Sequence, residues 1–147
     1  MPIEDQLITF PCDLYDILVH TDTTIKEAVL LRNTILHELT HIIGFEGDAL
    51  RFFRDDFGGP RKYDEVVQRR GGRDFVVLPR VTANARTHFG AFTGDFPGLR
   101  LENNGGSGTK GSHWETSDMG NEIMTGAVGS HSPYSKMTLA LLEDSGW

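Results

Sequence analysis

The chain has 147 residues and a formal net charge of −7, from 14 Lys and Arg against 21 Asp and Glu, which predicts one acidic domain. This charge balance, without any basic run, argues against binding to the phosphate backbone of nucleic acid. No apolar stretch reaches the roughly 18 residues of a membrane span, and the first ten residues lack the features of a signal peptide. The one cysteine, Cys12, excludes an internal disulfide framework and a Cys-rich zinc finger.

The first third of the chain has the pattern of regular secondary structure, because only Gly44 and Gly47 of the 17 glycines precede residue 58. Residues 16–20 (DILVH) predict a short strand. The stretch Thr24-Ile25-Lys26-Glu27 fits a capping box and predicts a helix that begins near Ile25. Apolar residues at helical spacing continue this helix to Gly44, where a positive φ is expected.

The later part of the chain predicts short elements between irregular segments. Residues 75–78 (FVVL) predict a strand that Pro79 ends, and residues 81–89 predict a short helix. Ser132 as N-cap and Pro133 at the first helical position predict a C-terminal helix that stops before Gly146. We expect the apolar residues of the two long helices to be buried together: Ile35, Leu36, Leu39, Ile42, Ile43, Leu139 and Leu142.

The motif His37-Glu38-Leu39-Thr40-His41 lies inside the first predicted helix. Residues four apart share a helix face, so the imidazoles of His37 and His41 can reach one ion, and neutral imidazole is a good zinc ligand. Glu38 can reach a zinc-activated water and take its proton as general base. The residue composition predicts only about 0.015 chance occurrences of this pattern. The motif therefore indicates a zinc-dependent hydrolase.

Two histidines leave such a site incomplete, because catalytic zinc normally has three protein ligands. In the compact version of the motif the third histidine follows the second by six residues, a position that Gly47 occupies here. The residues alone leave the third ligand open among His20, His88, His113, His131 and a carboxylate such as Glu65.

Residues 37–45 (HELTHIIGF) resemble the active-site helix of the leishmanolysin family, peptidase family M8, whose members are metzincins with a long insertion before the third histidine. Further matches follow in the family's order at residues 78–81, 85–90, 101–103, 106–109, 112–115 (SHWE), 121–126 (NEIMTG) and 138–147. Together these matches cover residues 34–147. The resemblance implies that His113 is the third zinc ligand and that Met124 is the methionine of the Met-turn beneath the metal, where it is not a ligand.

The resemblance also implies a fold and a function. The fold would be α+β, a metzincin-like core with a long active-site helix, a reduced N-terminal sheet and a loop-rich C-terminal part that ends in a helix. We expect a single partial catalytic domain over residues 1–147. Residues 1–44 would be the remnant of an N-terminal subdomain with the active-site helix, and residues 45–147 would carry the insertion, the third ligand, the Met-turn and the C-terminal helix. The implied activity is that of a zinc endopeptidase with one Zn²⁺ per chain and polypeptide substrates. The alternative is a catalytically impaired zinc-binding module of the family that acts in protein binding or cell adhesion.

The chain departs from the family pattern in two respects. Leishmanolysins are usually cysteine-rich and either secreted or held at the cell surface, whereas Ala91 stands here at a family cysteine position and Ser117 where an arginine is common. An extracellular location is thus expected from the family alone. Family members also have a longer N-terminal sheet, of which residues 16–20 resemble one strand, with only residues 21–24 left before the helix. We therefore expect a shortened or partial member.

Overall fold

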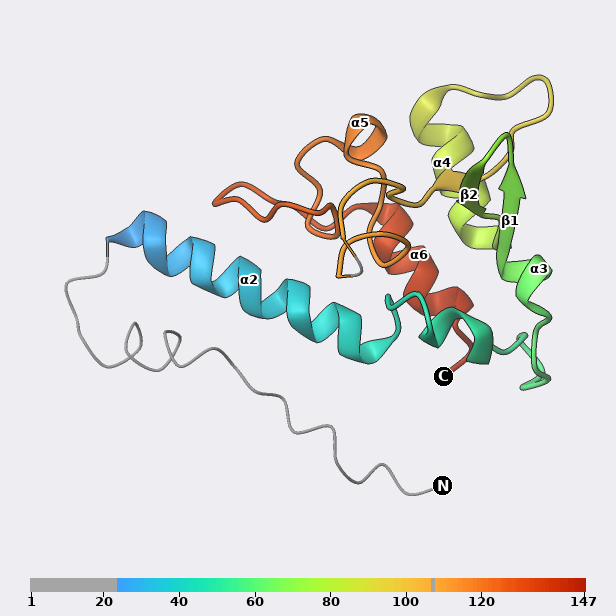
Figure 1. Ribbon diagram of the computed structural model, residues 1–147, viewed down its shortest axis with the longest axis horizontal. Coiled ribbons are helices and arrows are strands. Elements are labelled where there is room, and N and C mark those ends of the chain that lie inside the picture. The colour runs from blue at the N-terminus through green and yellow to red at the C-terminus, as the bar shows by residue number, and fades with distance from the viewer. Residues whose placement is uncertain (1–23, 107) are drawn as a thin grey trace.

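The computed structural model describes residues 24–106 and 108–147, and within them it has an α+β architecture (Figure 1). The expected strand at residues 16–20, together with Cys12 and His20, lies outside the described residues. The elements in chain order are α2 (Ile25–Ile43), the 3₁₀ helix η1 (Ala49–Phe52), α3 (Tyr63–Val66), β1 (Val67–Arg70), β2 (Arg73–Val76), α4 (Pro79–Phe89), β3 (Leu99–Arg100), α5 (Thr116–Met119) and α6 (Lys136–Asp144).

Helix α2 begins and ends where its sequence predicts. The Thr24 hydroxyl accepts a hydrogen bond from the backbone N–H of Glu27, and the Glu27 carboxylate accepts the backbone N–H of Thr24 at 2.7 Å. This capping box satisfies two of the N–H groups that a helix start leaves free. Gly44 ends the helix with φ of 146°, a backbone conformation that side chains with a Cβ rarely adopt.

The sheet has three antiparallel strands in the order β1-β2-β3, with Val67 opposite Val76 and Val76 opposite Leu99. Strand β2 was expected at residues 75–78 and lies two residues earlier. Pro79 occupies the first turn of α4 instead of merely ending a strand, so the chain has already left the sheet at Leu78, the N-cap of α4. The helix expected over residues 81–89 is α4, which begins two residues earlier than predicted.

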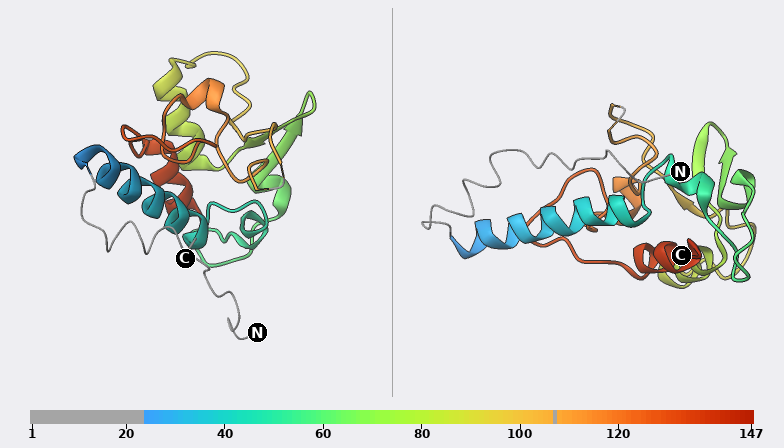
Figure 2. Two further views of the ribbon diagram at one scale, coloured as in Figure 1. Left: turned by 60° about the vertical axis from the view of Figure 1, so that its left-hand side comes forward. Right: turned by 90° about the horizontal axis from the view of Figure 1, so that it is seen from below.

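The core lies where α4 and α6 pack against each other, the sheet and the loop of residues 101–125 (Figures 1 and 2). Its largest fully buried side chains are Trp114, Phe45, Phe53, Leu50, Leu78, Leu99, Leu101, Ile123, Met124, Leu141, Val66 and Val76. At one edge of this core the carboxylate of Asp144, at the end of α6, accepts hydrogen bonds from the backbone N–H groups of Arg80 and Val81. Asp144 therefore caps α4, whose own N-cap, Leu78, has no side-chain acceptor.

The expectation that the apolar residues of the two long helices are buried together is wrong. Leu39, Ile42 and Ile43 remain 42%, 55% and 53% exposed. Leu139 of α6 is 54% exposed, whereas Leu36 and Leu142 are partly buried against the core. The physical reason is the rotation of α2, which turns its polar residues Asn33, His37 and Thr40 towards the rest of the described chain and its aliphatic stripe away from it.

The predicted start of the C-terminal helix is also wrong. Helix α6 begins at Lys136 with Ser135 as N-cap, whose hydroxyl accepts the backbone N–H of Thr138 at 3.2 Å. Ser132 and Pro133 belong to the preceding loop. Its contacts explain this, since the Ser132 hydroxyl accepts the N–H of Gly129 and the Pro133 carbonyl accepts the N–H of Ile123.

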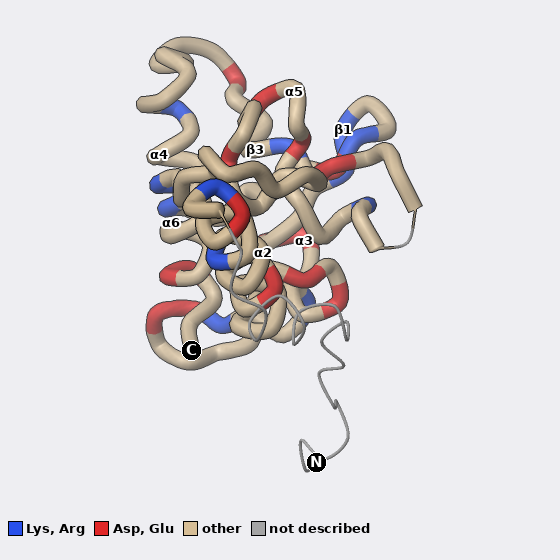
Figure 3. The backbone as a smooth tube through the Cα atoms, turned by 90° about the vertical axis from the view of Figure 1, so that its left-hand side faces the viewer, with Lys and Arg blue, Asp and Glu red and all other residues tan. Residues whose placement is uncertain are grey.

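Two features concern the molecule as a whole. Acidic and basic residues are both spread over the described backbone, as Figure 3 shows, although β1 and α4 carry only basic residues and α3 only acidic ones. Among residues 24–106 and 108–147, no helix combines the length and the hydropathy needed to cross a membrane.

Candidate metal centre

Three histidines, two from α2 and one from a loop far along the chain, meet at the inner face of α2. His37 and His41 lie one helical turn apart, and His113 follows 72 residues after His41. The Nε2 atoms are 3.0 Å apart for His37 and His41, 3.2 Å for His41 and His113, and 3.1 Å for His37 and His113. Among the described residues these three side chains form a group that could hold a metal ion.

The hydrogen bonds of the other ring nitrogens define the tautomer of each imidazole. Nδ1 of His37 lies 2.6 Å from the carbonyl oxygen of Ile123, Nδ1 of His41 lies 2.7 Å from that of Phe45, and Nδ1 of His113 lies 2.9 Å from that of Thr109. A carbonyl can only accept, so each Nδ1 carries the proton and donates it. Each Nε2 atom is then unprotonated and has a free lone pair. The three lone pairs converge on one position.

This arrangement fits a tetrahedral cation with one open position. Zn–N bonds of 2.0–2.1 Å at tetrahedral angles place neighbouring nitrogens about 3.3 Å apart, close to the 3.0–3.2 Å between these Nε2 atoms. Without a positive centre, three lone pairs at this separation would repel one another, so the donor set itself favours a cation. Three imidazoles with backbone carbonyls behind them are also a typical zinc ligand set.

The surroundings favour neutral imidazoles next to negative charge. Burial lowers the pKa of His37, opposed by its hydrogen bond to the Ile123 carbonyl, and burial likewise lowers the pKa of His113. Both shifts favour the neutral imidazole, which is the form that binds a metal. The carboxylates of Glu38 and Glu122 act electrostatically on His37, and that of Glu46 acts on His113. This negative field would attract a cation.

The segment that carries His113 is held between two others. The His113 carbonyl accepts the N–H of Glu102 at 2.8 Å, and the N–H of Trp114 donates to the Met124 carbonyl at 2.8 Å. The indole of Trp114 is fully buried and packs edge-on against the ring of Phe45 at 4.6 Å between centroids. Phe45 thus contributes twice, with its ring in the core and with its carbonyl on His41.

The structure places each described residue that the sequence analysis proposed for the site. Glu38 lies on α2 next to His37 with an exposed side chain, and Met124 is fully buried one residue after the carbonyl that orients His37. His88, His131 and Glu65, the other described candidates for a third ligand, are not in the three-histidine group. Sequence reasoning missed the carbonyls of Ile123, Phe45 and Thr109, because a backbone carbonyl leaves no trace in residue type.

The comparisons with known proteins agree on one family. The family model of leishmanolysin, Peptidase_M8, matches residues 18–147. A leishmanolysin-like peptidase of Drosophila melanogaster is 36% identical over 155 residues, which cover 83% of this chain and 22% of that protein. The leishmanolysin homolog of Crithidia fasciculata is 36% identical over 121 residues, covering 80% and 17%, and the leishmanolysin of Leishmania major is 31% identical over 121 residues, covering 80% and 18%. No solved structure matches the chain.

The α+β fold and the three-histidine group are consistent with a metallopeptidase domain, and the family model matches most of the chain. The chain belongs to the leishmanolysin family, a family of zinc metallopeptidases. It spans about a fifth of the length of the curated relatives that it matches.

Proposed function

We propose that this chain is a zinc-dependent metalloendopeptidase domain with His37, His41 and His113 as the ligands of one zinc ion and Glu38 as general base. The observation that carries the proposal is the convergence of three unprotonated Nε2 atoms within 3.2 Å of one another. Their arrangement leaves the fourth position of a tetrahedral ion open, as catalytic zinc sites require. Met124 would form the apolar floor beneath the three imidazoles.

The chain's own residues would divide the work as follows. A bound zinc ion would supply Lewis acidity, which lowers the pKa of water and polarises a carbonyl group. The three histidines would hold the ion by Nε2, while their Nδ1–H groups donate to the carbonyls of residues 123, 45 and 109. Glu38, exposed on α2 next to His37, would take a proton from the attacking water and deliver it to the leaving amine of a polypeptide substrate.

Substitution of Glu38 tests this division of roles. In Glu38→Ala, zinc binding should remain at one ion per chain, because no ligand is lost, while hydrolysis of a fluorescently labelled unfolded protein should fall by about 10²–10⁴-fold. Glu143→Gln is the matched control, since it changes an exposed glutamate on α6 and should leave the rate unchanged. Equal rates for wild type and Glu38→Ala would contradict the proposed base.

The second candidate function is a zinc-binding module that binds proteins without cleaving them. The observation that favours it is the exposed aliphatic stripe of Leu39, Ile42 and Ile43 on the helix that carries the motif, since contiguous exposed apolar surface marks interaction sites. The same assay separates the two candidates. A wild-type chain that binds zinc but cleaves no unfolded protein would favour the binding module.

A further inference from the structure

The carboxylate of Glu122 is buried without a cationic partner. The residue is 3% exposed, and within the described part of the chain no Lys or Arg forms an ion pair with it. Its oxygens are instead satisfied by three donors. Oε2 accepts the N–H of Met124 at 2.6 Å, and Oε1 accepts the N–H of Ser135 at 2.9 Å and the hydroxyl of Thr138. Burial of a carboxylate destabilises the folded state unless its oxygens accept hydrogen bonds, so a buried carboxylate without a cation needs an explanation.

The first bond rigidifies the turn that orients His37. Residues 122–125 form a tight turn in which the Thr125 N–H donates to the Glu122 carbonyl at 3.1 Å. The Glu122 side chain closes the same turn from within by accepting the N–H of Met124. Between these two bonds lies the Ile123 carbonyl, which accepts Nδ1–H of His37 at 2.6 Å. The position of the His37 imidazole therefore depends on a turn that Glu122 holds.

The second group of bonds connects Glu122 to the segment of His113. The Thr138 hydroxyl donates to Glu122 and accepts the indole N–H of Trp114 at 2.8 Å. Trp114 directly follows His113, and its backbone N–H donates to the Met124 carbonyl. One carboxylate thus links the supports of two of the three histidines. The carboxylate lies beside the N-terminus of α6, where it accepts the N–H of Ser135 and where the helix dipole favours a negative charge.

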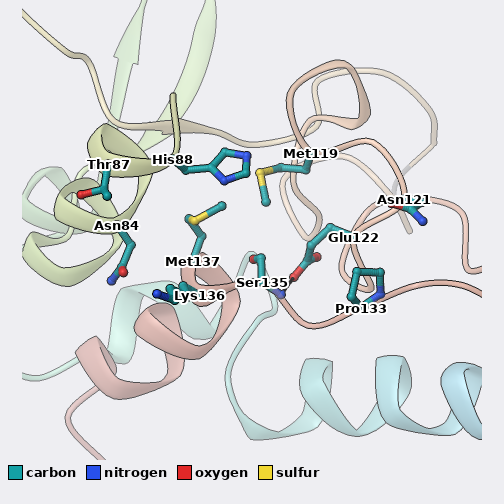
Figure 4. A pocket seen from close by; sticks show the side chains of 10 residues that line it. All are labelled: Asn84, Thr87, His88, Met119, Asn121, Glu122, Pro133, Ser135, Lys136 and Met137. Atoms are coloured by element: carbon teal, nitrogen blue, oxygen red, sulfur yellow. Dashed lines mark hydrogen bonds between the residues drawn. The ribbon is translucent and has the colours of Figure 1, made fainter. Parts of the chain in front are cut away.

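Glu122 also borders a cavity of about 520 Å³ between α4 and α6 (Figure 4). Both oxygens already accept hydrogen bonds from the turn and from α6. In Figure 4 the side chain lies beside Ser135 and Pro133, at the loop that leads into α6. The contacts therefore favour a role within the turn over a role as a ligand of the cavity.

We propose that Glu122 is a positioning residue of the metal centre, which sets the geometry of His37 and His113 through the turn of residues 122–125 and through Thr138 and Trp114. The inference rests on the proposed zinc site. Residues that orient metal ligands from behind typically contribute 10- to 100-fold to metal affinity. A role in general stability alone would lower the unfolding temperature without changing zinc affinity in the folded protein.

The test compares Glu122→Gln with Asp144→Asn, because both remove the charge of a buried carboxylate that accepts two backbone N–H groups. Zinc affinity is measured by competition with a chromophoric chelator, the visible absorption spectrum is recorded with Co²⁺ in place of zinc, and the unfolding temperature is measured without metal. We expect Glu122→Gln to lose 10- to 100-fold in zinc affinity and to show an altered Co²⁺ spectrum. Asp144→Asn should unfold at a lower temperature and keep wild-type zinc affinity and spectrum.

Two results would overturn the inference. One is a folded Glu122→Gln protein with the zinc affinity and Co²⁺ spectrum of the wild type, and the other is an equal loss of affinity in Asp144→Asn. If Glu122→Gln does not fold, Thr138→Val decides by the same criteria, since it removes only the hydroxyl between Trp114 and Glu122. A wild-type chain that binds no zinc would instead overturn the proposed function, which separates the two failures.

Discussion

The three imidazoles owe their orientation to backbone carbonyls from three different parts of the chain. His41 is held by Phe45 just beyond the end of its own helix, whereas His37 is held by Ile123, 86 residues away. The spacing of His37 and His41 was predictable, because residues four apart on a helix share a face. The approach of His113 was not predictable from spacing, and only the family resemblance selected it from the other histidines.

A substitution at His113 tests whether this histidine, unlike His131, binds the metal. In His113→Ala the two remaining imidazoles leave the site short of the three protein ligands that catalytic zinc normally has, so binding of one zinc per chain should be lost. His131→Ala should retain one zinc, since His131 is exposed and outside the group. Zinc content after gel filtration measures both, and tight one-to-one binding in His113→Ala would refute the ligand assignment.

The secondary-structure elements were predictable where local signals agree. The capping box and Gly44 placed both ends of α2, and the helix predicted over residues 81–89 starts within two residues of the observed α4. The start of α6 was missed because Ser132 and Pro133 fit a helix start locally, while tertiary hydrogen bonds hold both in a loop. The rotation of α2 was missed for a related reason, since Asn33, His37 and Thr40, and not the aliphatic residues, face the rest of the described chain.

Gly146 shows how closely the end of α6 is packed. It adopts φ of +77°, and an added Cβ would lie 2.6 Å from the carbonyl oxygen of Arg54, whose own N–H donates to the Ser145 carbonyl. We predict that Gly146→Ala destabilises the fold by about 2–4 kcal/mol, from the positive φ and the clash together. The matched control is Gly72→Ala, with φ of +79° and no atom near the added Cβ, which should cost only about 1 kcal/mol. Urea unfolding measures both, and equal losses would contradict the role of the clash.

At the scale of the whole molecule, the three-histidine group joins parts of the chain that lie far apart in the sequence. Helix α2 extends along one side of the described body (Figures 1 and 2). Its second half carries His37 and His41, and the later segment that packs beside it carries His113. A metal bound there would hold α2 against the loop. Metal binding only to the folded state adds to its stability by mass action.

Removal of the metal should therefore lower the unfolding temperature. With free zinc at 100 times its dissociation constant, the gain is about 2.7 kcal/mol, or an increase of about 5–10 °C for a chain of this size. We expect this increase in wild type on addition of zinc after chelation, and a much smaller one in His113→Ala. Differential scanning calorimetry measures both proteins, and an equal increase in the two would show that zinc stabilises the fold from another site.

We propose that this chain assembles one metal site from His37, His41 and His113. Its most direct test is the zinc content per folded chain of the purified 147-residue protein, with folding checked on the same sample by circular dichroism and a cooperative thermal transition. We expect a value near one. A value near zero in a well-folded chain that has been exposed to excess zinc would contradict this proposal.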